Sequence, residues 1–104
     1  MARFDIYANP FADERSHTPL VLDVQNDPLG PIGSRVVIPL RTARGFGTPA
    51  HDLNPLLEID GKSLVLDTAS IASVASTMLK RPVGRADRHR GEIATALDTL
   101  FGAY

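Results

Sequence analysis

The turn at residues 60–61 constrains the fold of this chain more than any other sequence feature. Two apolar runs, 56–59 and 62–66, are separated only by Asp60-Gly61. An Asp-Gly pair between apolar runs is typical of a two-residue hairpin turn, because both central residues must adopt a positive φ. The sequence therefore predicts an antiparallel hairpin over residues 56–66, and with it a β-sheet.

Two segments nearer the N-terminus alternate in the manner of half-buried strands. The first covers residues 4–7 and the second covers residues 20–25. In the second, Leu20, Leu22 and Val24 share one face while Asp23 and Gln25 point to the opposite face. Both segments are therefore expected to be strands with their apolar side chains towards the core.

A third and more apolar strand is predicted over residues 35–40. It contains Pro39, which has no amide hydrogen to donate to a neighbouring strand, so we expect an edge strand or a strand end there. The following residues, 41–52, contain two glycines and a proline and are expected to form a long mobile loop.

One helix is predicted, at the C-terminal end of the chain. Asp87 is its expected N-cap, because a carboxylate accepts hydrogen bonds from the free amides of the first turn. Gly102 follows the last apolar residue, where helices commonly stop. Ala103 and Tyr104 lie beyond that stop. An apolar stripe with helical spacing is expected to pack in the core; it comprises Ile93, Ala96, Leu97, Leu100 and Phe101.

The composition excludes several function classes. A chain of 104 residues is expected to form one domain over residues 1–104. Its net charge of −1 gives no bulk attraction to nucleic acid or membranes, and the absence of cysteine removes disulfides and thiolate metal sites. No secretory leader pattern or membrane-length apolar run is present, so we expect a soluble cytoplasmic protein.

No motif for a metal, a cofactor or a phosphate group is found. His17, His51 and His89 stand far apart in charged or loop segments, and we interpret each as a solvated surface side chain. No nucleophile elbow, Walker loop or dinucleotide-binding glycine motif is present. The sequence therefore predicts no metal site and no cofactor.

The segment Asp67-Thr68-Ala69 follows an apolar strand and is similar to the Asp-Thr-Gly/Ala signature of retropepsin-like aspartic proteases. That family also needs an apolar-apolar-Gly motif further along the chain and a glycine-rich flap, and neither is found. We therefore interpret Asp67 as the end of a strand and the start of a turn, with its side chain bonding nearby amides.

A set of motifs that spans nearly the whole chain resembles the CcdB family, the toxins of ccd-type toxin–antitoxin modules. The longest are Leu22–Asp27 and, after a short loop, Arg35–Leu40. Shorter matches occur before and after these two, and all of them stand in the same order as in the family. They are residues 4–7, Ala43-Arg44, Ile59-Asp60-Gly61, and His89-Arg90 before a final helix that ends in Leu-Phe plus three residues.

The resemblance implies a mainly β fold, an SH3-like barrel of antiparallel strands as in CcdB and MazF toxins, with one C-terminal α-helix. It also implies a homodimer. The toxins of the family are not enzymes and use no cofactor; they bind the A subunit of DNA gyrase and trap its cleaved-DNA complex. A CcdA-like antitoxin neutralises the toxin, and toxin and antitoxin together bind operator DNA and repress their own transcription.

The resemblance also implies site residues. Independently of the resemblance, we suggest Arg41 and Arg44, in the loop after the third strand, as antitoxin contacts because cations suit an acidic partner; a solvated loop is the alternative interpretation. The family's best-studied pattern ends in Trp-Gly-Ile after the phenylalanine, whereas this chain has Gly-Ala-Tyr. The residues carried over to the gyrase-binding face are Asn26, Leu29, Asp98, Gly102, Ala103 and Tyr104.

Two alternatives remain open. One is a CcdB-fold protein that binds an antitoxin but does not inhibit gyrase, or acts on another target, because a shared fold does not fix a shared function. The other is an endoribonuclease like the MazF toxins, for which the chain offers Arg41, Arg44 and His51-Asp52 in one loop.

Overall fold

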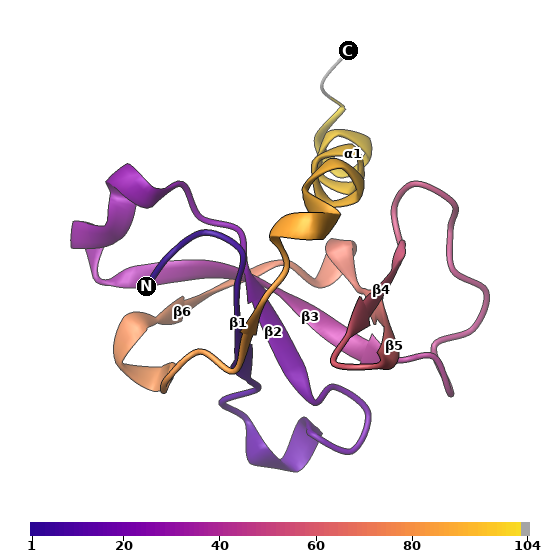
Figure 1. Ribbon diagram of the computed structural model, residues 1–104, viewed down its shortest axis with the longest axis horizontal. Coiled ribbons are helices and arrows are strands. Elements are labelled where there is room, and N and C mark those ends of the chain that lie inside the picture. Colours follow the sequence, from indigo (N-terminus) through magenta and orange to yellow (C-terminus); the bar gives the residue numbers. More distant parts are fainter. Residues whose placement is uncertain (103–104) are drawn as a thin grey trace.

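Strand β3 (Ser34–Thr42) is the centre of the sheet in the computed structural model, which describes residues 1–102. The strands are arranged in the order β4-β5-β3-β2-β1-β7, all antiparallel, and β6 also pairs with β3. One α-helix follows them (Figure 1). The remaining elements are β1 (Asp5–Ala8), β2 (Leu20–Asp23), β4 (Leu56–Ile59), β5 (Lys62–Leu66), β6 (Ala72–Ala75), β7 (Gly84–Arg85) and α1 (Arg90–Phe101).

The predicted fold class is confirmed. Within residues 1–102, the outermost strands β4 and β7 do not pair with each other, so the curved sheet is a half-barrel. Short 3₁₀ turns lie in several connections, and α1 closes one face of the sheet (Figure 1). No helix in this part of the chain has both the length and the apolar character that crossing a membrane requires.

The position expected for Pro39 is wrong, because Pro39 lies inside the central strand. On the side of β3 away from β2, strand β6 pairs with residues 34–37 and strand β5 with residues 40–42. Pro39 lies between the stretch of β3 that pairs with β6 and the stretch that pairs with β5. Its carbonyl accepts a hydrogen bond from the amide of Asp67 at 2.9 Å, so the missing amide hydrogen removes only the last bond of the β3–β5 ladder.

The predicted hairpin is confirmed. Strands β4 and β5 pair from Leu56 opposite Val65 to Ile59 opposite Lys62. Asp60 and Gly61 form the turn with φ of 51° and 78°. Both central residues therefore take the left-handed conformation that the Asp-Gly sequence predicts.

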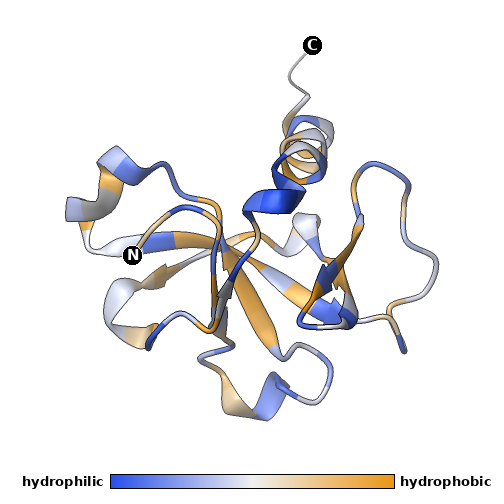
Figure 2. Cartoon of the chain, in the orientation of Figure 1, coloured by the Kyte–Doolittle hydropathy of each residue, from blue (hydrophilic) through white to orange (hydrophobic). Residues whose placement is uncertain are grey.

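The main core lies between the sheet and α1. Figure 2 shows the apolar colours concentrated along the central strands, while the turn before α1 is strongly hydrophilic. The buried side chains of this core come from the sheet, from the turn before the helix and from α1, and include Phe4, Ile6, Leu22, Val24, Ile38, Leu40, Leu57, Leu66, Ala86, Ile93 and Ala96.

The opposite face of the sheet is also covered. Tyr7, Val21, Val37 and Leu79 form a second buried cluster there. The predicted alternation of β2 is confirmed, but Asp23 is buried as completely as its apolar neighbours. Asp23 is satisfied by a buried partner, since Nε and Nη2 of Arg35 donate to its two oxygens at 2.7 and 2.9 Å.

The helix begins at Arg90, and the N-cap expected at Asp87 is wrong. The N-cap position of α1 is occupied by His89, and Asp87 lies in the turn before it. Its carboxylate instead accepts hydrogen bonds from the Arg85 guanidinium at 2.6 and 2.9 Å, which lowers the pKa of Asp87. A short 3₁₀ turn, Asp87–His89, leads into α1.

The predicted end of the helix is confirmed at Gly102. This residue has φ 69° and its amide donates to the carbonyl of Asp98 at 2.8 Å, as expected of a left-handed helix cap. The apolar stripe is only partly core: Ile93 and Ala96 are buried, but Phe101 is 69% exposed. The core assignment of Phe101 is therefore wrong, because the last turn of the helix extends past the sheet that covers the first turns.

Candidate functional site

The C-terminal end of α1 is presented outwards and is the first candidate surface. Asp98 and Gly102 are exposed, and the Phe101 ring stands largely free of the core. Ala103 and Tyr104 lie outside the described residues. The helix end offers an aromatic ring, a carboxylate and the free carbonyls of the last turn, which are groups suited to binding a partner.

The loop from Asn26 to Gly33 is the second candidate surface. Asn26 is exposed, and Leu29 and Ile32 are large apolar side chains that also face solvent. The buried side chain of Gln25 holds the loop in place, because it donates to the carbonyl of Leu29 at 3.1 Å and accepts from the amide of Val36 at 3.0 Å. The loop is therefore anchored to β3 while its apolar residues stay accessible.

These two surfaces are apart in a single chain. In Figure 1 the 26–33 loop lies to the left and the end of α1 lies at the top. Among residues 1–102, no hydrogen bond or ion pair joins Asn26 or Leu29 to the helix. The residues predicted for one gyrase-binding face thus form two separate groups in one copy of the protein.

Arg41 and Arg44 differ in whether their side chains already contact other residues of the chain. The Arg41 guanidinium lies 5.3 Å from the centre of the Phe46 ring and 3.9 Å from the carboxylate of Asp67, so it is partly occupied. Arg44 is exposed. Asp67 does end a strand, but it makes no side-chain cap hydrogen bond and faces Arg41 instead, so its expected bonds to nearby amides are not found.

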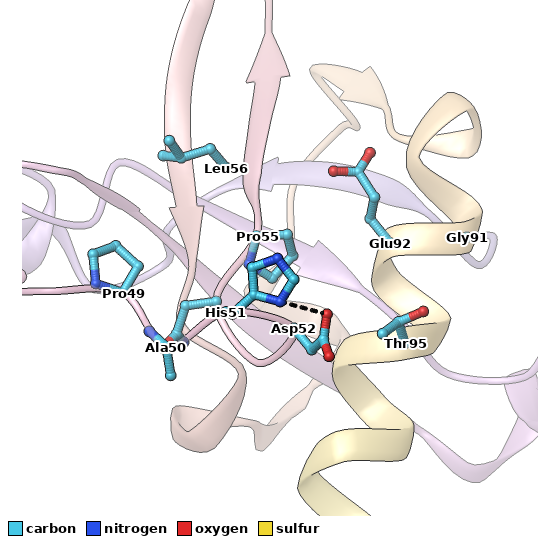
Figure 3. Close-up of a pocket in the computed structure, with 10 residues that line it drawn as sticks. Pro49, Ala50, His51, Asp52, Pro55, Leu56, Gly91, Glu92 and Thr95 are labelled. Carbon is cyan, nitrogen blue, oxygen red and sulfur yellow. Dashed lines mark hydrogen bonds and ion pairs between the residues drawn. The ribbon is translucent and has the colours of Figure 1, made fainter.

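A groove between α1 and the 49–56 segment is the third candidate surface (Figure 3). Its volume is about 860 Å³. Leu56 on β4 forms part of one wall, and Glu92 and Thr95 on α1 form the other. The remaining lining residues are Pro49, Ala50, His51, Asp52, Asn54, Pro55 and Gly91.

The charges of this groove are carboxylates. Asp52 lies 3.0 Å from Nδ1 of the fully exposed His51. Glu92 lies 2.8 Å from Nδ1 of His89, whose other ring nitrogen is 3.3 Å from the carbonyl of Glu58. His89 is only 13% exposed, so its predicted place as a solvated side chain is wrong: the ring links α1 to β4.

No metal site is formed in the described part of the chain. Among residues 1–102, no three His, Asp or Glu side chains gather closely enough to hold a metal ion.

Comparison with known proteins agrees with this arrangement of sheet and helix. The family model described as CcdB protein matches residues 3–102. The chain belongs to the CcdB protein family. The match covers nearly all of the chain, including the 26–33 loop, the groove and the whole of α1.

A solved structure shares the fold of this CcdB-family chain. It is described as an endoribonuclease in complex with its cognate antitoxin from a mycobacterial species, and the TM-score is 0.76. The similarity covers 100% of this chain and 97% of that chain, with 16% sequence identity. At that identity the likeness establishes the fold.

The groove was not anticipated from sequence, although one signal for it was present. In the predicted hairpin, Leu57 and Ile59 point to the core, so Leu56 must share the outer face with Glu58. A leucine at an outward position is an apolar side chain without a cover. That Glu92 and Thr95 line the groove could not be predicted from the sequence, because it depends on where α1 lies on the sheet.

Proposed function

We propose that this CcdB-family chain is the toxin of a type II toxin–antitoxin module, and that it poisons DNA gyrase by binding the A subunit and trapping the cleaved-DNA complex. The observation that carries the proposal is the family match over residues 3–102. The exposed end of α1, with Phe101 next to a left-handed Gly102, is consistent with a helix end that meets a partner.

The toxin acts by binding and does not catalyse a reaction. The proposed contact residues are Asn26, Leu29, Asp98, Gly102, Ala103 and Tyr104, and we add the exposed ring of Phe101 to them. Because the 26–33 loop and the helix end are apart in one chain, a continuous face requires a second copy. We therefore include a homodimer in the proposal, with each copy supplying part of the face.

A CcdA-like antitoxin is the second partner in the proposal. Arg41 and Arg44 are its suggested contacts; Arg44 is the freer of the two, since Arg41 also faces Phe46 and Asp67. Operator DNA would be bound only together with the antitoxin, and the module would operate in the cytoplasm.

An RNA-cleaving activity is the second candidate, because the fold neighbour is named an endoribonuclease and His51-Asp52 is an exposed pair. Two observations weigh against it. Lys and Arg supply most of the attraction to a nucleic-acid backbone, and the groove beside His51 is lined by two carboxylates, Asp52 and Glu92, with no Lys or Arg among its lining residues. Arg41, which was expected to assist, is directed to Phe46 and Asp67.

The test uses purified chain mixed with gyrase, supercoiled plasmid and ATP, followed by denaturation of the complex. The proposal predicts linear DNA with the intact chain and none with a chain shortened after Phe101. Phe101→Ala is expected to weaken poisoning by at least about 10-fold. Phe11→Ala, an exposed phenylalanine on a distant loop, is the matched control and should keep full activity.

Other outcomes separate the alternatives. Linear DNA with both the intact and the shortened chain would remove residues 102–104 from the contact face. No linear DNA with a folded intact chain that still binds a CcdA-like peptide would favour an antitoxin-binding protein with a different target. Cleavage of RNA without ATP would favour the endoribonuclease.

A further inference from the structure

We propose that the groove between α1 and the 49–56 segment is a docking site for a segment of a partner protein that presents apolar side chains flanked by lysine or arginine. The inference does not depend on gyrase as the target. It follows from the rigidity, the apolar lining and the charge of the groove.

The groove is already formed in the isolated chain. Asn54 holds the 49–56 segment, because its side chain donates to the carbonyl of Leu66 at 3.0 Å and accepts from the amide of Ala50 at 3.1 Å. The Thr68 hydroxyl donates to the carbonyl of Leu53 at 2.6 Å. A preformed wall loses little conformational entropy when a partner binds.

The wall of the groove that α1 forms is hydrogen-bonded to the β4–β5 hairpin, as the 49–56 segment is. Just before α1, Nη2 of Arg88 donates to the carbonyl of Glu58 at 2.6 Å, and the His89 ring lies against the same carbonyl. Both walls of the groove are therefore fixed to the β4–β5 hairpin, so the gap between them is a stable feature of the fold.

The lining contains apolar groups that the chain leaves uncovered. Leu56 is 54% exposed, and Pro49 and Ala50 are also exposed. A leucine and two small apolar residues beside an open groove are the kind of surface that an apolar side chain of a partner covers. Covering it would remove apolar area from water, which is the main driving force of such contacts.

The charge of the lining selects the chemistry of the partner. Asp52 and Glu92 carry side chains that are 57% and 51% exposed, one on each side of the groove. No Lys or Arg is among the lining residues, so the lining carries two carboxylates and no permanent cation. A cationic segment is attracted to this site, and a nucleic acid or an acidic segment is repelled.

The test uses two labelled peptides of the same amphipathic pattern, one of leucine and lysine and one of leucine and glutamate. Each is titrated into the full chain, with binding followed by fluorescence anisotropy and mapped by amide chemical shifts. The proposal predicts that the lysine peptide binds and shifts the amides of residues 50–57 and 91–96, while the glutamate peptide does not bind.

Groove variants give the second readout. Asp52→Asn together with Glu92→Gln should weaken binding of the lysine peptide by about 10-fold at low salt. Leu56→Ser should weaken it at all salt concentrations, because it removes the apolar contact. Asp13→Asn with Asp60→Asn changes the net charge equally at exposed positions outside the groove, and this control should bind as the unaltered chain does.

Three results would overturn the proposal. The first is equal binding of the two peptides, which would mean that charge does not select the partner. The second is a set of shifts spread outside the groove, or an equal loss of binding in the control variant. The third is binding of a short RNA, or self-association of the chain, that shifts the same groove amides and displaces the lysine peptide; either would replace the proposed partner.

Discussion

Arg35 and Asp23 join strands β3 and β2 through two hydrogen bonds of 2.7 and 2.9 Å, and both side chains are closed off from solvent. Exposure is 1% for the arginine and 0% for the aspartate. The hydrogen bond to Asp23 raises the pKa of Arg35 further above its ordinary value. A charge pair this deeply buried is tolerated only because each ion has its partner.

The first prediction concerns the removal of one member of this pair. Arg35→Met should lower the free energy of unfolding by about 3–5 kcal/mol, because Asp23 is left as an uncompensated buried charge. Chemical denaturation measures the loss. The double variant Asp23→Leu with Arg35→Met should regain most of it; a double variant as unstable as the single one would mean that packing, and not charge, dominates.

The second prediction separates the two ends of the apolar stripe on α1. Ile93→Ala should lower the free energy of unfolding by about 2–5 kcal/mol, because Ile93 is buried. Phe101→Ala should change it by less than about 0.5 kcal/mol, because the ring is exposed. Thermal unfolding at several protein concentrations provides the check. A Tm that rises with concentration in the unaltered chain, and not in Phe101→Ala, would place Phe101 between two copies.

The third prediction concerns stability at alkaline pH. Burial, together with the nearby carboxylate of Asp5, raises the pKa of Tyr7 from 10.0 to about 12. Above pH 10 the unfolded chain therefore loses the Tyr7 proton before the folded chain does, and stability falls as pH rises towards 12. In Tyr7→Phe, urea unfolding between about pH 9 and about pH 11 should show a smaller decline. An equal decline in both proteins would contradict this role for Tyr7.

The fourth prediction uses one substitution at two glycines. Gly61 has φ 78° and a Cβ there meets no atom within 4 Å, so Gly61→Ala is strained only in the backbone. It should lower the free energy of unfolding by about 1 kcal/mol. A Cβ at Gly91 also meets open space, but Gly91 lies in α1, where alanine is favoured over glycine. Gly91→Ala should therefore raise the free energy of unfolding by about 0.5–1 kcal/mol. Denaturation midpoints that move in the same direction would rule out this explanation.

The features predicted correctly are those that depend on neighbouring residues. The Asp60-Gly61 turn, the alternation of β2 and the helix stop at Gly102 are each set by a few adjacent side chains and their backbone preferences. Motif order along the chain was equally informative, since it indicated the family that the comparison then confirmed.

The features predicted wrongly depend on residues far along the chain. Pro39 is central because β3 changes its partner beside it. Asp87 is not a cap because Arg85 holds its carboxylate. Phe101 is exposed because the sheet ends before the helix does. The groove at Leu56 and Glu92 likewise exists only once α1 has been placed against the hairpin.

The change of partner at Pro39 divides the outer side of β3 into two segments that bond different strands. Strand β6 is bonded to residues 34–37 and the β4–β5 hairpin to residues 40–42, and the missing amide hydrogen of Pro39 ends the β3–β5 ladder between them. Fraying of β6 therefore need not spread to the hairpin that carries the groove. In native-state hydrogen exchange the amides facing β6 and those facing β5 should open as separate cooperative units.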